Sequence, residues 1–97
     1  MTKRKLAPVH PGEILKYEYL EPLGLSATAF AKAIGVPPNR VTRLMAGASA
    51  VTADTALRLA KALRTSPDMW MNLQSRYELD MAEDRGVPLA TISPIVA

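Results

Sequence analysis

The 97-residue sequence has no cysteine, a single histidine and few aromatic residues (5%). Without cysteine there is no disulfide, thiolate metal site or cysteine nucleophile, and one histidine excludes zinc sites built from several. No run of about 18 apolar residues is present, which excludes a transmembrane helix. The basic start, residues 1–5, is not followed by the apolar stretch of a secretory signal. These absences argue against metalloenzymes, triad hydrolases and membrane proteins, and we expect a cytoplasmic protein without cofactor or metal.

What the chain does have is a segregated charge. Residues 1–65 hold ten Lys/Arg and four acids, a formal charge of +6, whereas residues 66–97 hold two Lys/Arg and five acids, a charge of −3. No acidic residue occurs between Pro22 and Ala53. This segregation indicates that the first two-thirds of the chain meet a polyanion while the acidic end faces away. An ordinary solvated surface is the alternative.

Helix signals recur along the chain, and no segment alternates with period two. His10, Ser26, Thr52 and Ser66 are placed to cap helix starts. The predicted helices run from Pro11 to a stop at Glu21-Pro22, then over residues 26–34, 38–47, 52–63 and 66–83. We expect one all-α, five-helix domain over residues 10–84, flanked by a flexible basic arm (1–9) and an apolar C-terminal tail (85–97).

The three-residue turn at Gly35-Val36-Pro37 indicates a helix-turn-helix over about residues 26–46. Closely crossing helices need a small residue four positions before the turn glycine, and Ala31 is there. The turn itself needs a residue that tolerates positive φ, which Gly35 supplies. The expected inward residues are Phe30, Ile34, Val36, Val41 and Leu44. An unrelated αα-hairpin in a small bundle is the alternative.

The outward face of the second helix of such a motif enters the major groove of DNA. Asn39 is suited to bidentate pairing with adenine, and Arg43 or Arg40 to pairing with guanine. Thr42 offers a methyl and a hydroxyl, and Pro38 brings the first turn close to the base edges. The predicted base contacts are therefore Pro38, Asn39, Thr42 and Arg43, with a solvated helix face as the alternative.

Phosphate contacts are expected from donors that flank this helix. The predicted backbone contacts are Ser26, Thr28, Lys32, Arg40, Ser49, Thr52 and Thr55. Thr52 has a purely structural alternative as a helix cap, and Lys32 has one as a free surface lysine. The basic arm at residues 3–5 either follows the DNA or is a disordered, solubilising tail.

Several segments together resemble one family. They are His10–Leu15, Gly24–Ser26, Ala31 with Gly35, Arg43–Gly47, Val51–Ala60 and Ser66–Gln74. Over about residues 10–80 the chain resembles the HigA-type (VapI-like) antitoxins, which are Cro/repressor-like helix-turn-helix proteins. The resemblance implies a bacterial, nucleoid-associated homodimer that binds operator DNA and represses its own operon. It also implies that the protein neutralises a RelE-like (HigB-type), mRNA-cleaving toxin.

One departure from the family lies after the recognition helix, where many members carry a basic pair and this chain has Ala48-Ser49. Two potential phosphate contacts per protomer are missing, which predicts weaker and less salt-dependent DNA binding. Two other functions stay open. One is a stand-alone or phage-type regulator without a toxin, and the other is a protein-binding module that has lost DNA recognition. No nucleophile–base pair supports an enzyme.

The last third of the chain carries no evident chemistry. Trp70 and Leu73 are predicted to cover the first four helices, whereas Asn72 and Gln74 are expected to be exposed. The five acids there form either a solvated face or a surface for a basic toxin. Residues 86–97 are apolar and uncharged, so we expect this tail to pack on a dimer partner or on the domain. A frayed terminus is the alternative.

Overall fold

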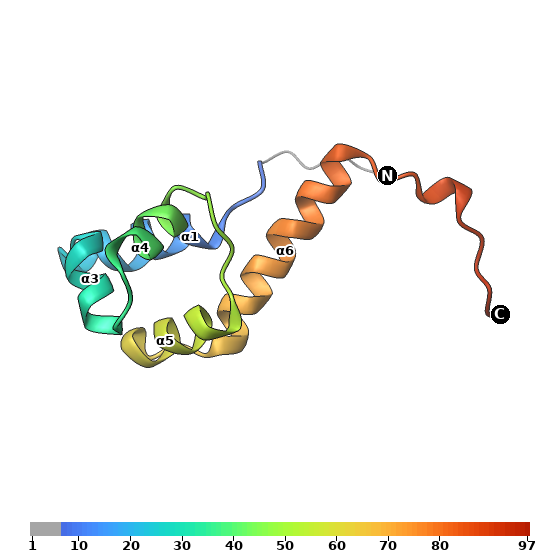
Figure 1. Ribbon diagram of the computed structural model, residues 1–97. Helices are drawn as coiled ribbons and strands as arrows, with labels where there is room; N and C mark the ends of the chain where they lie inside the picture. Colours follow the sequence, from blue (N-terminus) through green and yellow to red (C-terminus); the bar gives the residue numbers. More distant parts are fainter. Residues whose placement is uncertain (1–6) are drawn as a thin grey trace.

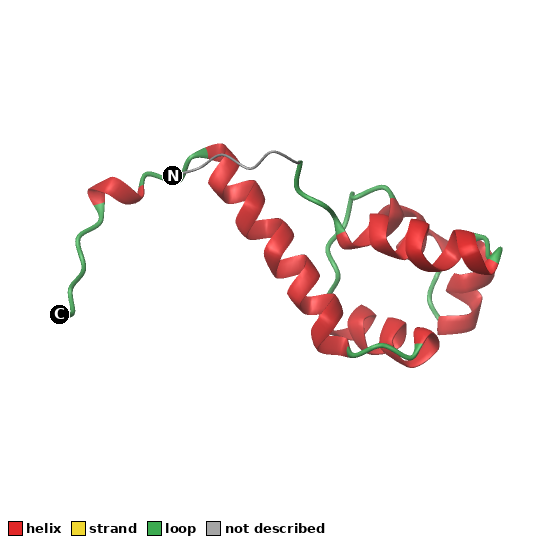
Figure 2. Ribbon diagram, turned by 180° about the vertical axis from the view of Figure 1, so that it is seen from behind, coloured by secondary structure: helices red, strands yellow, loops and turns green. Residues whose placement is uncertain are grey.

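The computed structural model describes residues 7–97, and within this range the chain is helical with no strand (Figures 1 and 2). The elements are α1 (Pro11–Ile14), η1 (a π-helix, Leu15–Leu20), α2 (Glu21–Leu23), α3 (Ala27–Ile34), α4 (Pro38–Met45), α5 (Ala53–Leu63), α6 (Pro67–Arg85) and η2 (a 3₁₀ turn, Leu89–Thr91). Because α1, η1 and α2 follow one another without a break, the domain has five helices. The all-α prediction is confirmed.

The first of these helices does not stop at Glu21-Pro22, and that prediction is wrong. The backbone widens into π-type turns, in which the Glu21 N–H bonds to the carbonyl of Lys16, five residues back. A proline inside a regular helix collides with the carbonyl four residues before it, and the wider turn accommodates Pro22. The helix ends at Gly24, which adopts a left-handed conformation with φ of 66°.

The four predicted helix caps, His10, Ser26, Thr52 and Ser66, are confirmed. The hydroxyls of Ser26, Thr52 and Ser66 each accept a hydrogen bond from the backbone N–H three residues on, at 3.0–3.3 Å. His10 caps α1 with its ring, because Nδ1 accepts from the Gly12 N–H at 2.8 Å. These side chains satisfy N–H groups that the helix itself leaves unpaired. Helix ends are shifted slightly from the predictions: α4 ends at Met45 and α6 extends to Arg85.

The core lies between the helices of residues 10–77 and is almost entirely aliphatic. Its buried hydrophobic members are Leu15, Leu20, Phe30, Ala31, Ile34, Val36, Val41, Leu44, Val51, Ala56, Leu59, Ala60 and Trp70. Trp70 is 0% exposed, its ring lies 5.7 Å from that of Tyr19, and its Nε1–H donates to the Thr65 hydroxyl at 2.7 Å. Leu73 is half-buried against the same cluster. The predicted core role of Trp70 and Leu73 is confirmed.

Two close contacts connect the amino-terminal turn to the rest of the fold. Gly12 lies so near the end of α4 that an added Cβ would overlap the Leu44 carbonyl. The buried His10 ring packs edge-on against Tyr77 of α6, with ring centroids 4.8 Å apart. The start of α1 is therefore held between the end of α4 and the middle of α6.

Gln74 is buried at 5% exposure, so the prediction that it is exposed is wrong. It follows Trp70 by one helical turn and faces the same way. Its Oε1 accepts from the Val51 N–H at 2.8 Å, and its Nε2 donates to Glu78 at 3.0 Å. Gln74 thus fastens the loop between α4 and α5 to α6. Asn72 is exposed, as predicted.

The C-terminal tail leaves the domain beyond Gly86 and extends away from it, as Figure 1 shows in red. Its apolar side chains are exposed, and Ile92 keeps 66% of its surface. The prediction that the tail packs on the domain is wrong within this single chain, because no helix is placed to cover it. The basic residues of the amino-terminal arm, 3–5, lie outside the described residues. No helix between residues 7 and 97 is long and apolar enough to cross a membrane.

Candidate nucleic-acid interface

The helix-turn-helix is formed by α3 and α4. Gly35 ends α3 with φ of 74°, and the Val36 N–H bonds back to the Ala31 carbonyl at 3.0 Å. Ala31 is fully buried, which lets the two helices approach closely. The predicted inward residues, Phe30, Ile34, Val36, Val41 and Leu44, are all buried. The predicted packing of the motif is confirmed.

The opposite face of α4 is exposed and polar. Its exposed residues are Pro38, Asn39, Arg40, Thr42, Arg43 and Ala46. Asn39 and Arg43 are four residues apart, so the amide and the guanidinium lie one turn apart on the same face. The Thr42 hydroxyl donates to the Asn39 carbonyl at 3.3 Å, and Arg43 donates to the Ala48 carbonyl at 3.4 Å. The buried Val41 and Leu44 hold this face rigidly against the domain.

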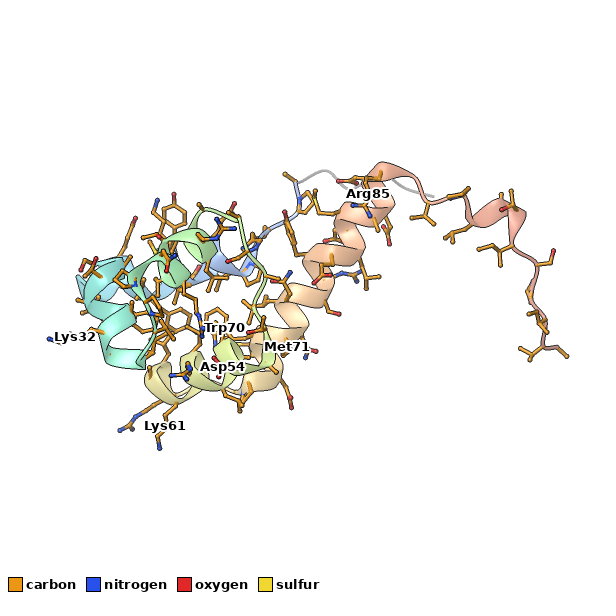
Figure 3. All side chains as sticks on the ribbon, in the orientation of Figure 1. Lys32, Asp54, Lys61, Trp70, Met71 and Arg85 are labelled. Atoms are coloured by element: carbon orange, nitrogen blue, oxygen red, sulfur yellow. The ribbon has the colours of Figure 1, made fainter. Side chains whose placement is uncertain are left out.

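The residues predicted to contact phosphate differ in accessibility. Thr28 and Lys32 are exposed on α3, and Lys32 points outward in Figure 3. Ser26 and Thr52 are exposed, but their hydroxyls cap α3 and α5. Ser49 is half-buried in the loop before α5.

Thr55 does not fit the prediction of a phosphate contact. It is 5% exposed, and its hydroxyl accepts a hydrogen bond from the Thr52 hydroxyl at 3.2 Å. The β-branched side chain sits on the inner side of the first turn of α5, against the core rather than toward solvent. Its role in the structure is to support the Thr52 cap.

Asp54 and Arg58 take part in the interface, and the sequence reasoning missed them. One Asp54 oxygen, Oδ2, accepts from Arg40 of α4 at 2.8 Å and from Nε of Arg58 at 3.0 Å. Arg58 also donates to the Ile34 carbonyl at 2.7 Å, at the end of α3. The spacing of Asp54 and Arg58 is that of a helical ion pair, a signal present in the sequence. Their link to Arg40 and Ile34 depends on how α5 packs.

The electrostatics of this region follow from that arrangement. Hydrogen bonding to Arg58, joined by the charges of Arg58 and Arg40, holds the pKa of Asp54 below its ordinary value. Asp54 is the only acidic residue in residues 22–54, and its carboxylate is paired with both Arg40 and Arg58. Arg40, Ser49, Thr52, Asp54 and Arg58 line an open hollow of about 400 Å³ beside the recognition helix. Figure 3 shows Asp54 on α5 at this place.

Between residues 7 and 97 no group of three or more His, Asp or Glu side chains is placed to hold a metal ion. The geometry offers hydrogen-bond donors on a rigid, exposed helix and cations beside it. Such an arrangement suits recognition of a polyanion by contacts to base edges and phosphates.

Comparison with known proteins identifies the same motif. Residues 16–70 match the helix-turn-helix family. The chain is 43% identical over 93 residues to virulence-associated protein I of Dichelobacter nodosus, covering 96% of this chain and 86% of that protein. It is 44% identical over 79 residues to antitoxin HigA-1 of Vibrio cholerae serotype O1, covering 81% and 74% of the two chains.

Solved structures agree with these relatives. Antitoxin GraA, determined in complex with its operator, superposes with a TM-score of 0.88 at 37% identity over 100% of both chains. Pseudomonas aeruginosa antitoxin HigA, determined with the higBA promoter, superposes with a TM-score of 0.86 at 36% identity, covering 92% of this chain and 99% of that one. Proteins of this kind are DNA-binding regulators rather than enzymes, as the sequence predicts. This chain belongs to the HigA-type (VapI-like) antitoxins of the Cro/repressor-like helix-turn-helix family.

Proposed function

We propose that this protein is the antitoxin of a type II toxin–antitoxin system. As a homodimer it binds operator DNA and represses its own operon in the bacterial cytoplasm, at the nucleoid. It also binds and neutralises a RelE-like, mRNA-cleaving toxin of the HigB type. The observation that carries the DNA-binding part is that α4 buries one apolar face in the domain and exposes a polar face on the opposite side. Relatives in the family have been determined with operator or promoter DNA.

Four residues of α4 read the bases in this proposal. Asn39 and Arg43 pair with adenine and guanine edges, each bidentate contact supplying about 1–3 kcal/mol of discrimination. Thr42 contacts a thymine methyl or a neighbouring phosphate. Pro38 occupies the first helical turn, where the lack of an N–H costs no hydrogen bond and the ring allows close approach to the groove.

Contacts to phosphate position the helix without reading sequence. We propose that Ser26, Thr28 and Lys32 contribute them from the start and outer side of α3. Ser49 and Thr52 contribute from the loop before α5. Arg40, at the edge of α4, either joins them or pairs with a guanine edge, as Arg43 does. Because Ala48 and Ser49 replace a basic pair, the salt dependence of binding is shallower than in members that carry the pair.

The tail and the outer part of α6 supply the dimer contact. Their exposed apolar side chains include Leu79, Met81, Val87, Leu89, Ile92, Ile95 and Val96. Apolar side chains gathered in this way without charges favour burial against another surface. A second copy of the chain offers the same surface, as twofold symmetry requires. The acidic residues of α6 lie beside it, and we propose that those at its surface meet a basic toxin.

DNA recognition is tested by binding to promoter DNA of the operon that encodes the protein, against shuffled DNA of equal composition. We expect Arg43→Ala and Asn39→Ala each to weaken promoter binding about tenfold to a hundredfold while binding to shuffled DNA changes little. Lys61→Ala is the matched control, because it removes one exposed cation from α5, away from the face of α4 (Figure 3). Equal, sequence-indifferent binding by every variant would show that α4 does not read bases.

The toxin is tested by co-expression of this protein with the neighbouring gene and capture through a tag on this chain. A RelE-like protein recovered in complex, with growth restored in cells that express it, supports the antitoxin. DNA binding without such a neighbour would identify a stand-alone regulator. A captured partner without any DNA binding would identify a protein-binding module.

A further inference from the structure

The carboxylate of Asp54 lies between α4, which is proposed to read bases, and the start of α5, where the cap residue Thr52 is proposed to contact phosphate. Its Oδ2 atom lies 2.8 Å from a terminal nitrogen of Arg40, on the exposed face of α4. The same oxygen lies 3.0 Å from Nε of Arg58, one turn along α5. Arg40 keeps 44% and Asp54 keeps 57% of their side-chain surface, so the pair borders solvent where the proposed interface lies.

Arg58 fixes the position of that carboxylate relative to the helix-turn-helix. Its NH1 donates to the Ile34 carbonyl at 2.7 Å and to the Gly35 carbonyl at 3.3 Å. The guanidinium therefore bridges the last turn of α3 and Asp54. Because a planar guanidinium with several bonds has little freedom, Asp54 is anchored to the motif as well as to α5.

Affinity does not explain a carboxylate at this place, and stability explains it only in part, because an acid in the first turn of α5 interacts favourably with the helix dipole. Exposed ion pairs contribute little to folding. A negative charge beside a DNA-binding helix repels phosphates and lowers affinity for any sequence. What the carboxylate does achieve is to fix the direction of Arg40, whose remaining Nε and NH2 form a two-donor edge suited to one guanine or one phosphate.

We propose that Asp54 is a positioning residue that holds Arg40 in one orientation and so sets sequence discrimination rather than overall affinity. The proposal rests on the operator binding proposed above. A fixed Arg40 makes its contact only where the DNA places an acceptor in register. A freed Arg40 moves to the nearest phosphate on any sequence, which raises non-specific binding.

The test is Asp54→Asn, with affinities for promoter and shuffled DNA measured by fluorescence polarisation at several salt concentrations. We expect the ratio of the two affinities to fall about tenfold, chiefly because binding to shuffled DNA tightens. One new phosphate contact per protomer, hence two per homodimer, steepens the salt dependence on shuffled DNA by about two units of log affinity per log salt. Asp68→Asn is the matched control, since Asp68 is the second residue of α6 as Asp54 is of α5. Asp68→Asn is expected to change neither the ratio of promoter to shuffled affinity nor the salt dependence.

A second comparison separates positioning from charge. In an Arg40→Ala background, Asp54→Asn is expected to leave the affinity ratio and the salt slope unchanged, because the residue it positions is gone. The same salt-slope change with and without Arg40 would show simple repulsion of DNA and overturn the proposal. An unchanged ratio in Asp54→Asn alone would also overturn it.

The outcome for the wild-type protein keeps the two proposals apart. If it prefers promoter DNA and Arg43→Ala loses that preference, operator binding stands whatever Asp54→Asn does. If the wild type shows no preference, operator binding fails, and the role of Asp54 fails with it. Thermal melts by circular dichroism check folding of each variant. If Asp54→Asn is unfolded, Asp54→Ser, which is also neutral, serves instead: a lowered ratio of promoter to shuffled affinity supports positioning, and an unchanged ratio overturns it.

Discussion

The helix-turn-helix half of this protein and its C-terminal part differ in how completely a single chain buries them. From α1 to the middle of α6 the helices enclose an apolar core, although single side chains such as Leu57 are exposed, and buried polar groups such as His10 and Gln74 have partners. Beyond that, Leu79 and the tail residues lie exposed. Figure 2 shows the same contrast from behind: a cluster of helices at one end and an extended tail at the other. The first part has a core of its own, whereas the apolar side chains of the second are left uncovered in the single chain.

The two parts also differ in the charge they present. Before α6 the described residues carry seven Lys/Arg and four acids, whereas α6 carries two Arg and five acids. A chain with a basic, rigid face at one end and an acidic, apolar one at the other can bind nucleic acid and protein without competition between them. Four substitutions test whether this division holds.

The largest effect is expected from Gly12→Ala, which attacks the packed half. The new methyl group would overlap the Leu44 carbonyl, so α1 and the end of α4 must separate. We expect a loss of about 3 kcal/mol in the free energy of unfolding, measured by urea titration. Gly24→Ala is the control: no atom lies within 4 Å of its added Cβ, and only the positive φ costs about 1 kcal/mol. Equal losses in the two variants would mean that the close contact is unimportant.

The second effect belongs to the exposed half. If the tail is covered in a dimer, Ile92→Ser removes a buried side chain from each protomer and weakens the dimer by about 2 kcal/mol in total, roughly thirtyfold in the dissociation constant. Sedimentation at a series of concentrations measures the change. Leu57→Ser alters an equally exposed leucine on α5, 61% exposed, and should leave assembly intact. Dimers of wild-type strength in Ile92→Ser would exclude the tail from the interface.

Gln74→Leu tests the boundary between the two halves. The substitution leaves the Val51 N–H buried without a partner, which we expect to cost about 1.5 kcal/mol. The neighbouring Ser75→Ala, at an exposed position, should change stability by less than about 0.5 kcal/mol. Both are measured by urea titration. If Gln74→Leu leaves the free energy of unfolding unchanged, the packed part of the molecule ends before residue 74 rather than after it.

The smallest effect concerns pH and His10. Burial of the ring lowers its pKa below 6.5, although the Ser49 backbone and Glu13 oppose this shift. The unfolded chain therefore takes up the proton more readily, so the contribution to stability is complete above about pH 6.5 and is lost as pH falls through the lowered pKa.

His10→Asn keeps a capping oxygen but removes the titration. We expect it to cost about 1 kcal/mol at pH 7.5, mainly through the lost contact with Tyr77. The difference from wild type should shrink as the pH is lowered to 5.5, in melts followed by circular dichroism. Because this is the only histidine in the sequence, parallel pH profiles for the two proteins would contradict the assignment.

The sequence predicts most of the helix-turn-helix because its requirements are local. The glycine of the turn, the small residue at position 31 and the capping hydroxyls act within a few residues of where they stand. The π-type turns at residues 15–20 are not predicted, because a proline ordinarily signals a helix end and nothing in the local sequence indicates the wider turn that continues it.

The parts that sequence reasoning missed are those made by distant residues. Arg58 bonds to a carbonyl 24 positions earlier, and Gln74 to an N–H 23 positions earlier. Nothing in the local pattern distinguishes these side chains from exposed polar ones. The tail shows the converse: its apolar composition is plain in the sequence, but within the single chain no part of the fold covers it.

Trp70, the sole tryptophan of the chain, has a consequence for observing this molecule in solution. Its indole is enclosed at the place where α6 joins the core and is hydrogen-bonded to Thr65. The emission spectrum of the indole therefore changes when α6 leaves the core and stays constant when two intact chains separate at their tails. Emission anisotropy, which follows tumbling, responds to the separation. One natural fluorophore thus distinguishes melting of the domain from dissociation of the assembly.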